Sequence, residues 1–306
     1  MLGTMSRALW RGLAHRDGVL VVAAHQARGV ANLAARSFAA AASPTQQQEG
    51  PKAALMIIGD EVLSGSITDS NTGFLAKLLH SRGVDMVHAC IIPDDKREIV
   101  ETVLRLKERV GPDGFVFTSG GIGPTHDDIT YEAIAAAFGA ELELHQPTVE
   151  RMEEHYRQRG VELNEARLRM AKLPTDEGVE YLFTPGLWVP LVAIQQTYIL
   201  PGIPRLFQQM VEAHAGRFKG PAAHTRVLYS NMGEGDLAIK LGSVAAMHPA
   251  VRVGSYPNVA WESDASKTPW RVKLQFESRD AAALERAVEA AEAALPGTFT
   301  LSAQAA

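Results

Sequence analysis

The sequence predicts an α/β fold with a mostly parallel sheet, helices on both of its faces, and a small C-terminal α+β domain. Strand-like and helix-like segments alternate from Pro51 onward, which is typical of right-handed βαβ crossovers. The alternation changes character after residues 216–223, where Gly220 and Pro221 indicate a linker. We therefore expect one domain at residues 51–218 and a smaller one at residues 224–300.

Local patterns define each expected element of the first domain. Aliphatic runs predict strands and one-sided apolar repeats predict helices. Asp95 and Glu98 form a capping-box pattern, and Gly139 marks a helix end. In chain order we expect strand 53–58, helix 71–81, strand 84–92, helix 95–110, strand 114–118, helix 130–138, helix 147–159, helix 164–172, strands 180–184 and 191–200, and helix 204–218.

The smaller domain shows the same kinds of pattern at shorter intervals. Its expected elements are strand 225–230, helix 236–247, strand 251–255, strand 270–277 and helix 281–294. Two of the strands follow each other without a helix between them, which indicates an α+β unit.

Composition limits what the chain can be. With 306 residues, 46% of them hydrophobic, the chain can form a full core. No stretch approaches the roughly 18 uninterrupted apolar residues of a membrane-spanning helix, so we expect no membrane association. The one cysteine, Cys90, lies in an apolar run and is interpreted as a buried side chain.

Residues 1–48 differ in kind from the rest. They contain five arginines, one acid (Asp17) and many alanines, a composition typical of an organelle transit peptide. Arg36-Ser37-Phe38 followed by Ala39 resembles a mitochondrial cleavage site. We expect a disordered segment that directs import into the mitochondrion. The plastid is the alternative destination. The other interpretation is a disordered tail without a targeting function.

Charge argues against nucleic acid as a partner. The whole chain carries −5, and residues 1–48 contribute +5 and −1, so the remainder carries about −9. A protein with this net negative charge and without clustered Lys and Arg residues lacks the positive surface that binds nucleic-acid phosphates. A small molecule is the expected partner.

Two loops combine glycines with carboxylates at the ends of predicted strands. One begins at Gly59-Asp60-Glu61 and runs to Asp69, Ser70 and Asn71; the other runs from Ser119 to Thr130. In open α/β sheets, ligands bind outside the carboxyl ends of the strands. Three glycines in four residues allow close approach of the backbone to an anion. The expected ligand-binding residues are Asp69, Asn71, Ser119, Gly120, Gly121, Ile122, Gly123, Pro124 and Thr125, with Pro201 and Gly202 added by the family resemblance described below.

The charges of these loops predict a metal. The segments bring carboxylates together but contain no Lys or Arg, so a phosphate would be repelled without a divalent cation such as Mg²⁺, Mn²⁺ or Co²⁺. We expect Asp60, Asp127 and Asp128 as metal ligands and Asp60 and Asp127 as catalytic groups. Asp69 and Asp128 also stand where helix N-caps are expected.

Nearby basic residues admit two interpretations. His126 is a base or ligand, or simply a solvated loop residue. Arg167, Arg169 and Lys172 fall on one predicted helical segment and form a solvated face, or they close over phosphate oxygens.

Several motifs together resemble the molybdopterin-binding-like domain of MoaB/Mog type, which is shared by CinA proteins and the N-terminal half of eukaryotic FAD synthases. The resemblance covers roughly residues 53–277, and its motifs are residues 59–63, 69–71, 118–128 and 200–204, with Gly-Ser-Tyr-Pro at 254–257. It implies metal-dependent hydrolysis of a nucleotide pyrophosphate, FAD or ADP-ribose, releasing AMP. It also suggests association into homo-oligomers.

Departures from the family patterns argue against pterin chemistry and against the activities of the other halves of these relatives. Enzymes that adenylylate molybdopterin carry Gly-Gly-Thr-Gly where this chain has Ile122, and another residue where Asp127 stands. After about residue 300 we expect neither the adenylyltransferase half of FAD synthases nor the deamidase half of CinA. The alternatives are a molybdopterin- or nucleotide-binding protein of molybdenum-cofactor type and a non-catalytic regulatory module of FAD metabolism.

Overall fold

The computed structural model describes residues 49–260 and 269–301. The expected transit segment at residues 1–48 lies outside the described residues. None of the helices in the described ranges is long and apolar enough to cross a membrane.

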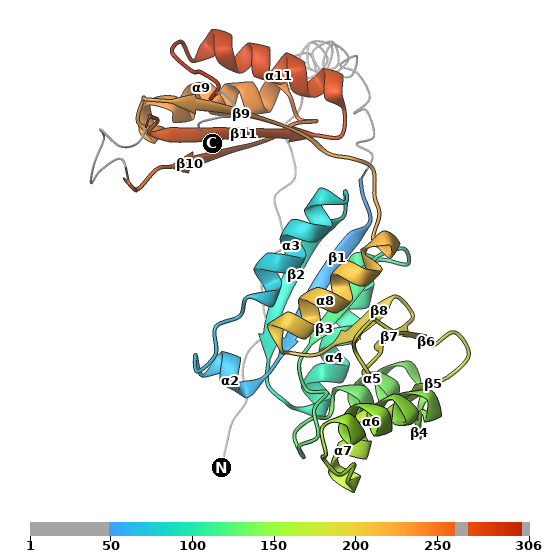
Figure 1. Cartoon of the computed structure of the whole chain (residues 1–306). Coiled ribbons are helices and arrows are strands. Elements are labelled where there is room, and N and C mark those ends of the chain that lie inside the picture. Colours follow the sequence, from blue (N-terminus) through green and yellow to red (C-terminus); the bar gives the residue numbers. More distant parts are fainter. Residues whose placement is uncertain (1–48, 261–268, 302–306) are drawn as a thin grey trace, which may run out of the picture. The chain divides into compact units, whose positions relative to one another are not determined.

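The larger domain is built on a six-stranded sheet with the order β2-β1-β3-β8-β7-β6 (Figure 1). Strands β2, β1, β3 and β8 run parallel to one another, and β7 and β6 continue the sheet by antiparallel pairing. Their bounds are β1 Lys52–Ile58, β2 Asp85–Ile92, β3 Phe115–Ser119, β6 Glu180–Leu182, β7 Leu191–Ile194 and β8 Thr197–Leu200. The predicted α/β class with a mostly parallel sheet is confirmed.

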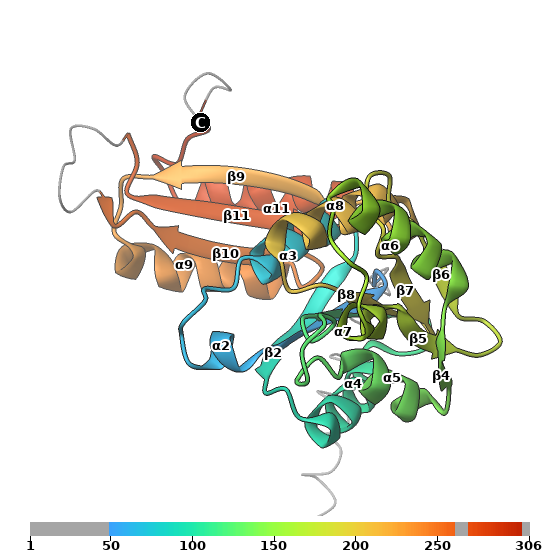
Figure 2. The same ribbon diagram turned by 60° about the horizontal axis from the view of Figure 1, so that its bottom comes forward.

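Helices cover both faces of this sheet (Figures 1 and 2). Helices α3 and α8 contact each other on one face, and α4 and α5 contact each other on the other. The helices of this domain are α2 Asp60–Leu63, α3 Asn71–Ser81, α4 Lys96–Val110, α5 Thr130–Phe138, α6 Gln146–Gln158, α7 Glu165–Leu168 and α8 Pro204–His214, with 3₁₀ turns η1 Arg169–Ala171 and η2 Ala215–Arg217.

Local signals explain where several helices begin and end. Asp95 accepts a hydrogen bond from the Glu98 N–H at 2.9 Å and so caps α4 as expected. Gly139 ends α5 in the left-handed conformation with φ 72°, which a residue without a Cβ adopts at little cost.

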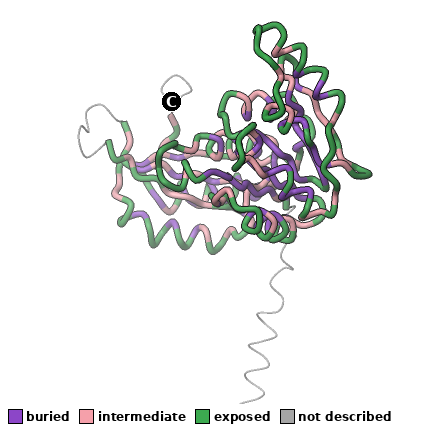
Figure 3. The backbone as a smooth tube through the Cα atoms, turned by 90° about the horizontal axis from the view of Figure 1, so that it is seen from below, coloured by how far each residue is buried: buried purple, intermediate pink, exposed green. Residues whose placement is uncertain are grey.

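Buried residues run along the central strands (Figure 3). Every residue of β3 is buried, as expected for a strand covered on both faces. Phe117 stacks on Tyr198 with ring centroids 5.4 Å apart, and Phe218 packs edge-on against both rings. These aromatic contacts connect β3 and β8 to Phe218, which follows the 3₁₀ turn η2.

The smaller domain is a three-stranded antiparallel sheet, β10-β11-β9, packed on α9 and α11. Alternate residues of β11 are buried, which is typical of a sheet with one covered face. Its elements are β9 His224–Ser230, α9 Glu234–Met247, β10 Arg252–Pro257, β11 Val272–Ser278 and α11 Ala281–Ala294. The expected small α+β domain is confirmed.

Two expectations about single elements were wrong, and one strand pairing was not expected. The run 191–200 is not one strand but the hairpin β7-β8, which turns at Gln195 and Gln196. Residues 164–172 do not form one helix: α7 ends at Leu168, and after η1 the chain enters β5 (Lys172–Thr175). Strand β5 pairs with β4 (Glu141–Leu144), which the sequence analysis did not anticipate.

Candidate functional site

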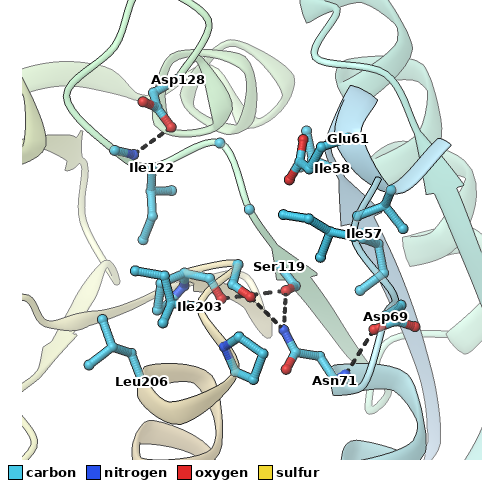
Figure 4. A pocket seen from close by; sticks show the side chains of 18 of the residues that line it. Ile57, Ile58, Glu61, Asp69, Asn71, Ser119, Ile122, Asp128, Ile203 and Leu206 are labelled. Carbon is cyan, nitrogen blue, oxygen red and sulfur yellow. Dashed lines mark hydrogen bonds between the residues drawn. The ribbon is translucent and has the colours of Figure 1, made fainter. Parts of the chain in front are cut away.

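Three loops meet at the carboxyl edge of the parallel strands. Ile57 of β1 lies opposite Ser119 of β3, and Ser119 lies opposite Leu200 of β8, so the segments that follow these strands are neighbours. They enclose a cavity of about 470 Å³ (Figure 4). Its lining includes most of the predicted ligand-binding residues, namely Asp69, Asn71, Ser119, Gly120, Gly121, Ile122, Gly123, Pro124, Pro201 and Gly202.

Asn71 connects the three loops at the floor of the cavity (Figure 4). Its Nδ2 donates to Ser119 Oγ at 2.9 Å and to the Gly202 carbonyl at 3.0 Å. Ser119 Oγ in turn donates to the Pro201 carbonyl at 3.4 Å. Because the Gly202 carbonyl can only accept, the amide of Asn71 is fixed in one orientation. The site is therefore held by buried polar contacts rather than by loop composition alone.

The two glycines after β3 have backbone conformations that other residues avoid. Gly120 has φ 114° and Gly121 has φ 64°, and a Cβ on Gly120 would overlap the Ile58 carbonyl oxygen. Thr130 fixes the turn, because its Oγ1 donates to the Gly120 carbonyl at 2.9 Å and its N–H donates to the Gly121 carbonyl at 2.9 Å. Glycine at these positions is thus required by geometry.

The loop also presents free backbone donors. Among the described residues, the N–H groups of Gly121 and Ile122 donate to no other group. Both residues line the cavity. Successive free N–H groups in a glycine turn form a concavity that suits an anion.

Asp128 holds the loop closed instead of capping the following helix. Its Oδ1 accepts from the Gly123 N–H at 2.6 Å, and its Oδ2 accepts from the N–H and the Oγ1 of Thr125 at 2.8 and 2.5 Å. Helix α5 has Ile129 at its N-cap and receives no side-chain cap. The expected capping role of Asp128 was therefore wrong, because both carboxylate oxygens are engaged within the loop.

Asp69 does act as a cap. Its Oδ1 accepts from the N–H groups of Asn71 and Thr72 at 2.8 and 3.2 Å, which satisfies two donors of the first turn of α3. The same side chain lines the cavity. Asp69 thereby positions Asn71 while its other oxygen makes no further hydrogen bond in the described residues.

A further carboxylate, Asp94, lies beside the site just after the end of β2, although it does not line the cavity. Asp94 Oδ2 accepts from the Asp60 N–H at 3.0 Å, and Oδ1 lies 3.4 Å from where a Cβ on Gly121 would stand. Burial raises the pKa of Asp94, the Asp60 N–H lowers it, and the charges of Glu61, Asp60 and Asp127 raise it. Asp94 was not among the expected site residues, because the segment after strand 84–92 contains no glycine. Its signal was a Pro-Asp-Asp segment directly after a strand.

Asp127 lies outside the cavity lining on an exposed part of the loop. Its side chain is 58% exposed, with Oδ1 3.9 Å from His126 Nδ1. The Thr125 side chain and backbone hydrogen bonding lower the pKa of Asp127, and the charges of His126 and Arg169 lower it further. Asp127 is thus held as a carboxylate at the rim.

The carboxylates expected as metal ligands are not arranged around one common point. Among the described residues, no group of three or more His, Cys, Asp or Glu side chains is placed to hold a metal ion, so Asp60, Asp127 and Asp128 do not form one. A magnesium-like ion is nevertheless commonly held by one or two carboxylates together with substrate phosphates and water. Glu61 and Asp69 line the cavity and can serve as such donors. Asp60, expected as a ligand, lies outside the lining, where its N–H contacts Asp94.

The remaining walls of the cavity are apolar. Ile57, Ile122, Ile203 and Leu206 surround it in Figure 4, and Trp188 adds an aromatic side chain. Within the described part of the chain, no Lys, Arg or His lines this cavity. An apolar cavity with a few polar groups at one edge suits a planar ring that carries a phosphate.

Comparison with known proteins identifies the domains. Residues 54–219 match the family described as "Probable molybdopterin binding domain", and residues 222–304 match "FAD synthase, middle domain". A probable FAD synthase from Caenorhabditis elegans is 31% identical over 272 residues, 80% of this chain and 50% of that protein. A CinA-like protein from Myxococcus xanthus is 35% identical over 162 residues, 52% of this chain and 37% of that protein. The chain thus spans half or less of the length of these two relatives.

Other matches extend over nearly whole proteins. A protein from Archaeoglobus fulgidus is 30% identical over 235 residues, 77% of this chain and 94% of that protein. The crystal structure of "the protein CinA with unknown function" from Thermoplasma acidophilum is 27% identical, has a TM-score of 0.49, and covers 56% of this chain and 99% of its own. With more than half of its length matched, the chain belongs to the family of the probable molybdopterin binding domain, of the MoaB/Mog-like type found in CinA and FAD synthase relatives.

Proposed function

We propose that the chain hydrolyses the pyrophosphate of a nucleotide such as FAD or ADP-ribose, with a divalent metal, and releases AMP. The observation that carries the proposal is the cavity at the glycine loop. It joins apolar walls, two free backbone donors and carboxylates, and no basic side chain lines it. The relatives described as FAD synthase and CinA-like support a ligand of this class.

The chemistry requires water to attack one phosphorus while the bridging P–O bond breaks. A divalent cation bound there (Mg²⁺, Mn²⁺ or Co²⁺) would neutralise charge on the phosphates. The N–H groups of Gly121 and Ile122 stabilise charge on a phosphate oxygen. Asp94, whose pKa is raised, accepts the proton of the attacking water. Asp60 and Asp127 supply further negative charge to hold the cation.

A second candidate function is binding of a phosphorylated pterin. The family description favours it, and an apolar cavity flanked by isoleucines accepts a pterin ring as well as a flavin or adenine ring. A third candidate, a non-catalytic module, would use the same cavity without the attacking water.

A turnover screen separates these functions. The full-length chain is incubated with FAD, ADP-ribose, NADH or a molybdopterin analogue, with Mg²⁺, Mn²⁺, Co²⁺ or EDTA, and AMP is measured by chromatography. We expect AMP from FAD or ADP-ribose with metal and none with EDTA. Absence of AMP under every metal condition would refute the hydrolase. Tight FAD binding without AMP would support the non-catalytic module.

A further inference from the structure

A second cavity adjoins the first at the glycine loop. It measures about 730 Å³, and Ile122, Gly123 and Asp128 line both cavities. Each volume lies in the range of small-molecule sites, roughly 300–1,000 Å³. One short stretch of backbone therefore borders two separate hollows, and a ligand longer than one nucleotide could occupy both.

The two cavities differ in charge. The first has no basic lining, whereas Arg169 of η1 and Lys172 of β5 line the second. Both side chains are exposed, and among the described residues neither lies within 4.0 Å of a carboxylate. Arg169 is close enough to Asp127 to help lower its pKa. These are two unpaired cations beside the loop that carries the free N–H groups.

The carboxylates of the second cavity do not cancel these cations. Glu132 is paired with Lys96 at 2.6 Å, and Asp128 is engaged in its own loop. Glu165 has no ion pair in the described residues. An unpaired carboxylate beside a phosphate site can accept hydrogen bonds from ribose hydroxyls, as in dinucleotide-binding folds.

Apolar side chains complete the second cavity. Leu142 and Leu144 of β4 are 36% and 47% exposed and line it together with Leu168. Leucines left in contact with solvent beside cations and a carboxylate offer a surface for a purine or flavin ring. The cavity thus contains a partner for each part of a nucleotide: phosphate, ribose and ring.

We propose that the two cavities bind the two halves of one pyrophosphate-linked nucleotide, with its pyrophosphate crossing the backbone at Ile122 and Gly123. Arg169 and Lys172 bind phosphate oxygens on the side of the second cavity, Glu165 binds the ribose, and the first cavity holds the other half. This inference rests on the proposed function and narrows its substrates to nucleotides whose two halves are joined by a pyrophosphate, FAD and ADP-ribose among them. Mononucleotides and phosphorylated pterins fill only one cavity.

Binding of a non-hydrolysable ADP-ribose analogue tests the inference without turnover. The full-length chain with Mn²⁺ is titrated calorimetrically with the α,β-methylene analogue of ADP-ribose, and separately with AMP and ribose 5-phosphate. The double variant Arg169→Gln, Lys172→Gln removes two charge-assisted contacts, and we expect at least a tenfold loss of affinity for the analogue. The double variant should bind one of the two halves, AMP or ribose 5-phosphate, with an affinity within about twofold of that of the unmodified chain. This is the half that occupies the first cavity.

A matched control is Arg159→Gln, which removes an exposed arginine at the end of α6 that lines neither cavity. It should bind the analogue as the unmodified chain does. Equal affinity of the double variant and the unmodified chain would overturn the second site and leave the proposed function intact. An equal loss for the analogue and for both halves would also overturn it, since that indicates general electrostatics. If the unmodified chain binds none of these ligands, the proposed function falls as well.

Discussion

Two adjacent aspartates in the glycine loop have different surroundings and therefore different expected roles. Asp128 accepts three hydrogen bonds from Gly123 and Thr125 within its own loop, whereas Asp127 is exposed and held as a carboxylate. The sequence alone suggested a cap at Asp128. The structure instead makes Asp128 the residue that shapes the loop and leaves Asp127 available to a ligand.

Substituting each aspartate separates these roles. Asp127→Asn should leave the melting temperature nearly unchanged and lower turnover about a hundredfold or more, the scale of losing a charged catalytic group. Asp128→Asn cannot accept at both positions with an amide, so it should lower stability by roughly 1–3 kcal/mol. Melting temperature and kcat are measured for both at one metal concentration. Full activity of Asp127→Asn, or loss of its fold together with its activity, would contradict its role in catalysis.

Asp94 gives a pH-dependent prediction. Its pKa is raised above the ordinary value of 3.8 mainly by burial, so the folded state binds this proton more tightly than the unfolded state, and ionisation above the folded pKa costs stability. If Asp94 accepts the proton from water, kcat should fall as pH decreases through a value above 3.8. Asp94→Asn should remove that limb and lower kcat while keeping or raising the melting temperature. A variant with an unchanged pH–rate profile would exclude Asp94 as the proton acceptor.

At the scale of elements, most of the fold could be predicted because its helices and strands carry local signals. The cap at Asp95 and the stop at Gly139 are examples. The segment 164–172 was mistaken for a helix because its apolar spacing continues to Lys172. Helix α7 ends at Leu168, and the chain becomes extended after η1. Leu173 precedes Pro174, and a residue before proline favours extended backbone. Pairing with β4 then fixes β5, and such pairing is invisible in a local window.

The candidate site was only partly predictable, because part of it also depends on contacts between segments that are distant in the sequence. Loops after β1 and β3 stood out by composition, and the parallel register brings them together. Asp94 lies beside Asp60 because β2 is paired with β1. Local sequence patterns do not reveal the order of strands in the sheet. The engagement of both oxygens of Asp128 depends on the fold of the loop itself, which the sequence pattern did not specify.

The β7-β8 hairpin offers a prediction about stability. Gln195 and Gln196 have φ 47° and 60°, a region that costs most residues free energy and that asparagine tolerates better. Two such residues between paired strands suit a type I′ turn, for which Asn-Gly is preferred. Gln195→Asn should raise the free energy of unfolding by roughly 0.5–1 kcal/mol. Gln196 is left unchanged because its Oε1 accepts from Tyr198 Oη at 2.8 Å.

Denaturant unfolding of the Gln195→Asn variant measures this effect. The matched control is Gln158→Asn at the end of α6, where no positive φ is relieved, and no gain is expected there. A decrease in stability for Gln195→Asn would show that the turn is not limited by backbone strain.

At the scale of the whole molecule, the described residues form two large hydrophobic cores besides a small cluster around Met152, and Arg279 links residues that belong to different parts of the chain. One core surrounds the six-stranded sheet and the other lies between the three-stranded sheet and its helices. Arg279 follows β11, and its Nη1 lies 3.0 Å from Asp85 Oδ2 at the start of β2. Its Nη2 donates to the Gly83 carbonyl at 3.0 Å, and its Nε donates to the Pro221 carbonyl at 3.4 Å. One guanidinium thus satisfies three acceptors.

Removing this side chain should destabilise the protein more than breaking a surface ion pair would. The side chains of Arg279 and Asp85 are 18% and 24% exposed, so Arg279→Ala leaves a half-buried carboxylate and two carbonyls with fewer partners, at a cost of about 2 kcal/mol. Arg279→Lys should recover little, because an ammonium group is a point charge and lacks the planar fork that meets three acceptors. The control is Arg226→Ala, whose pair with Glu285 is 56% and 48% exposed, and it should cost less than about 1 kcal/mol. Calorimetric melting of the three variants decides the matter: if Arg279→Ala and Arg226→Ala melt alike, the contacts of Arg279 contribute no more than a surface pair.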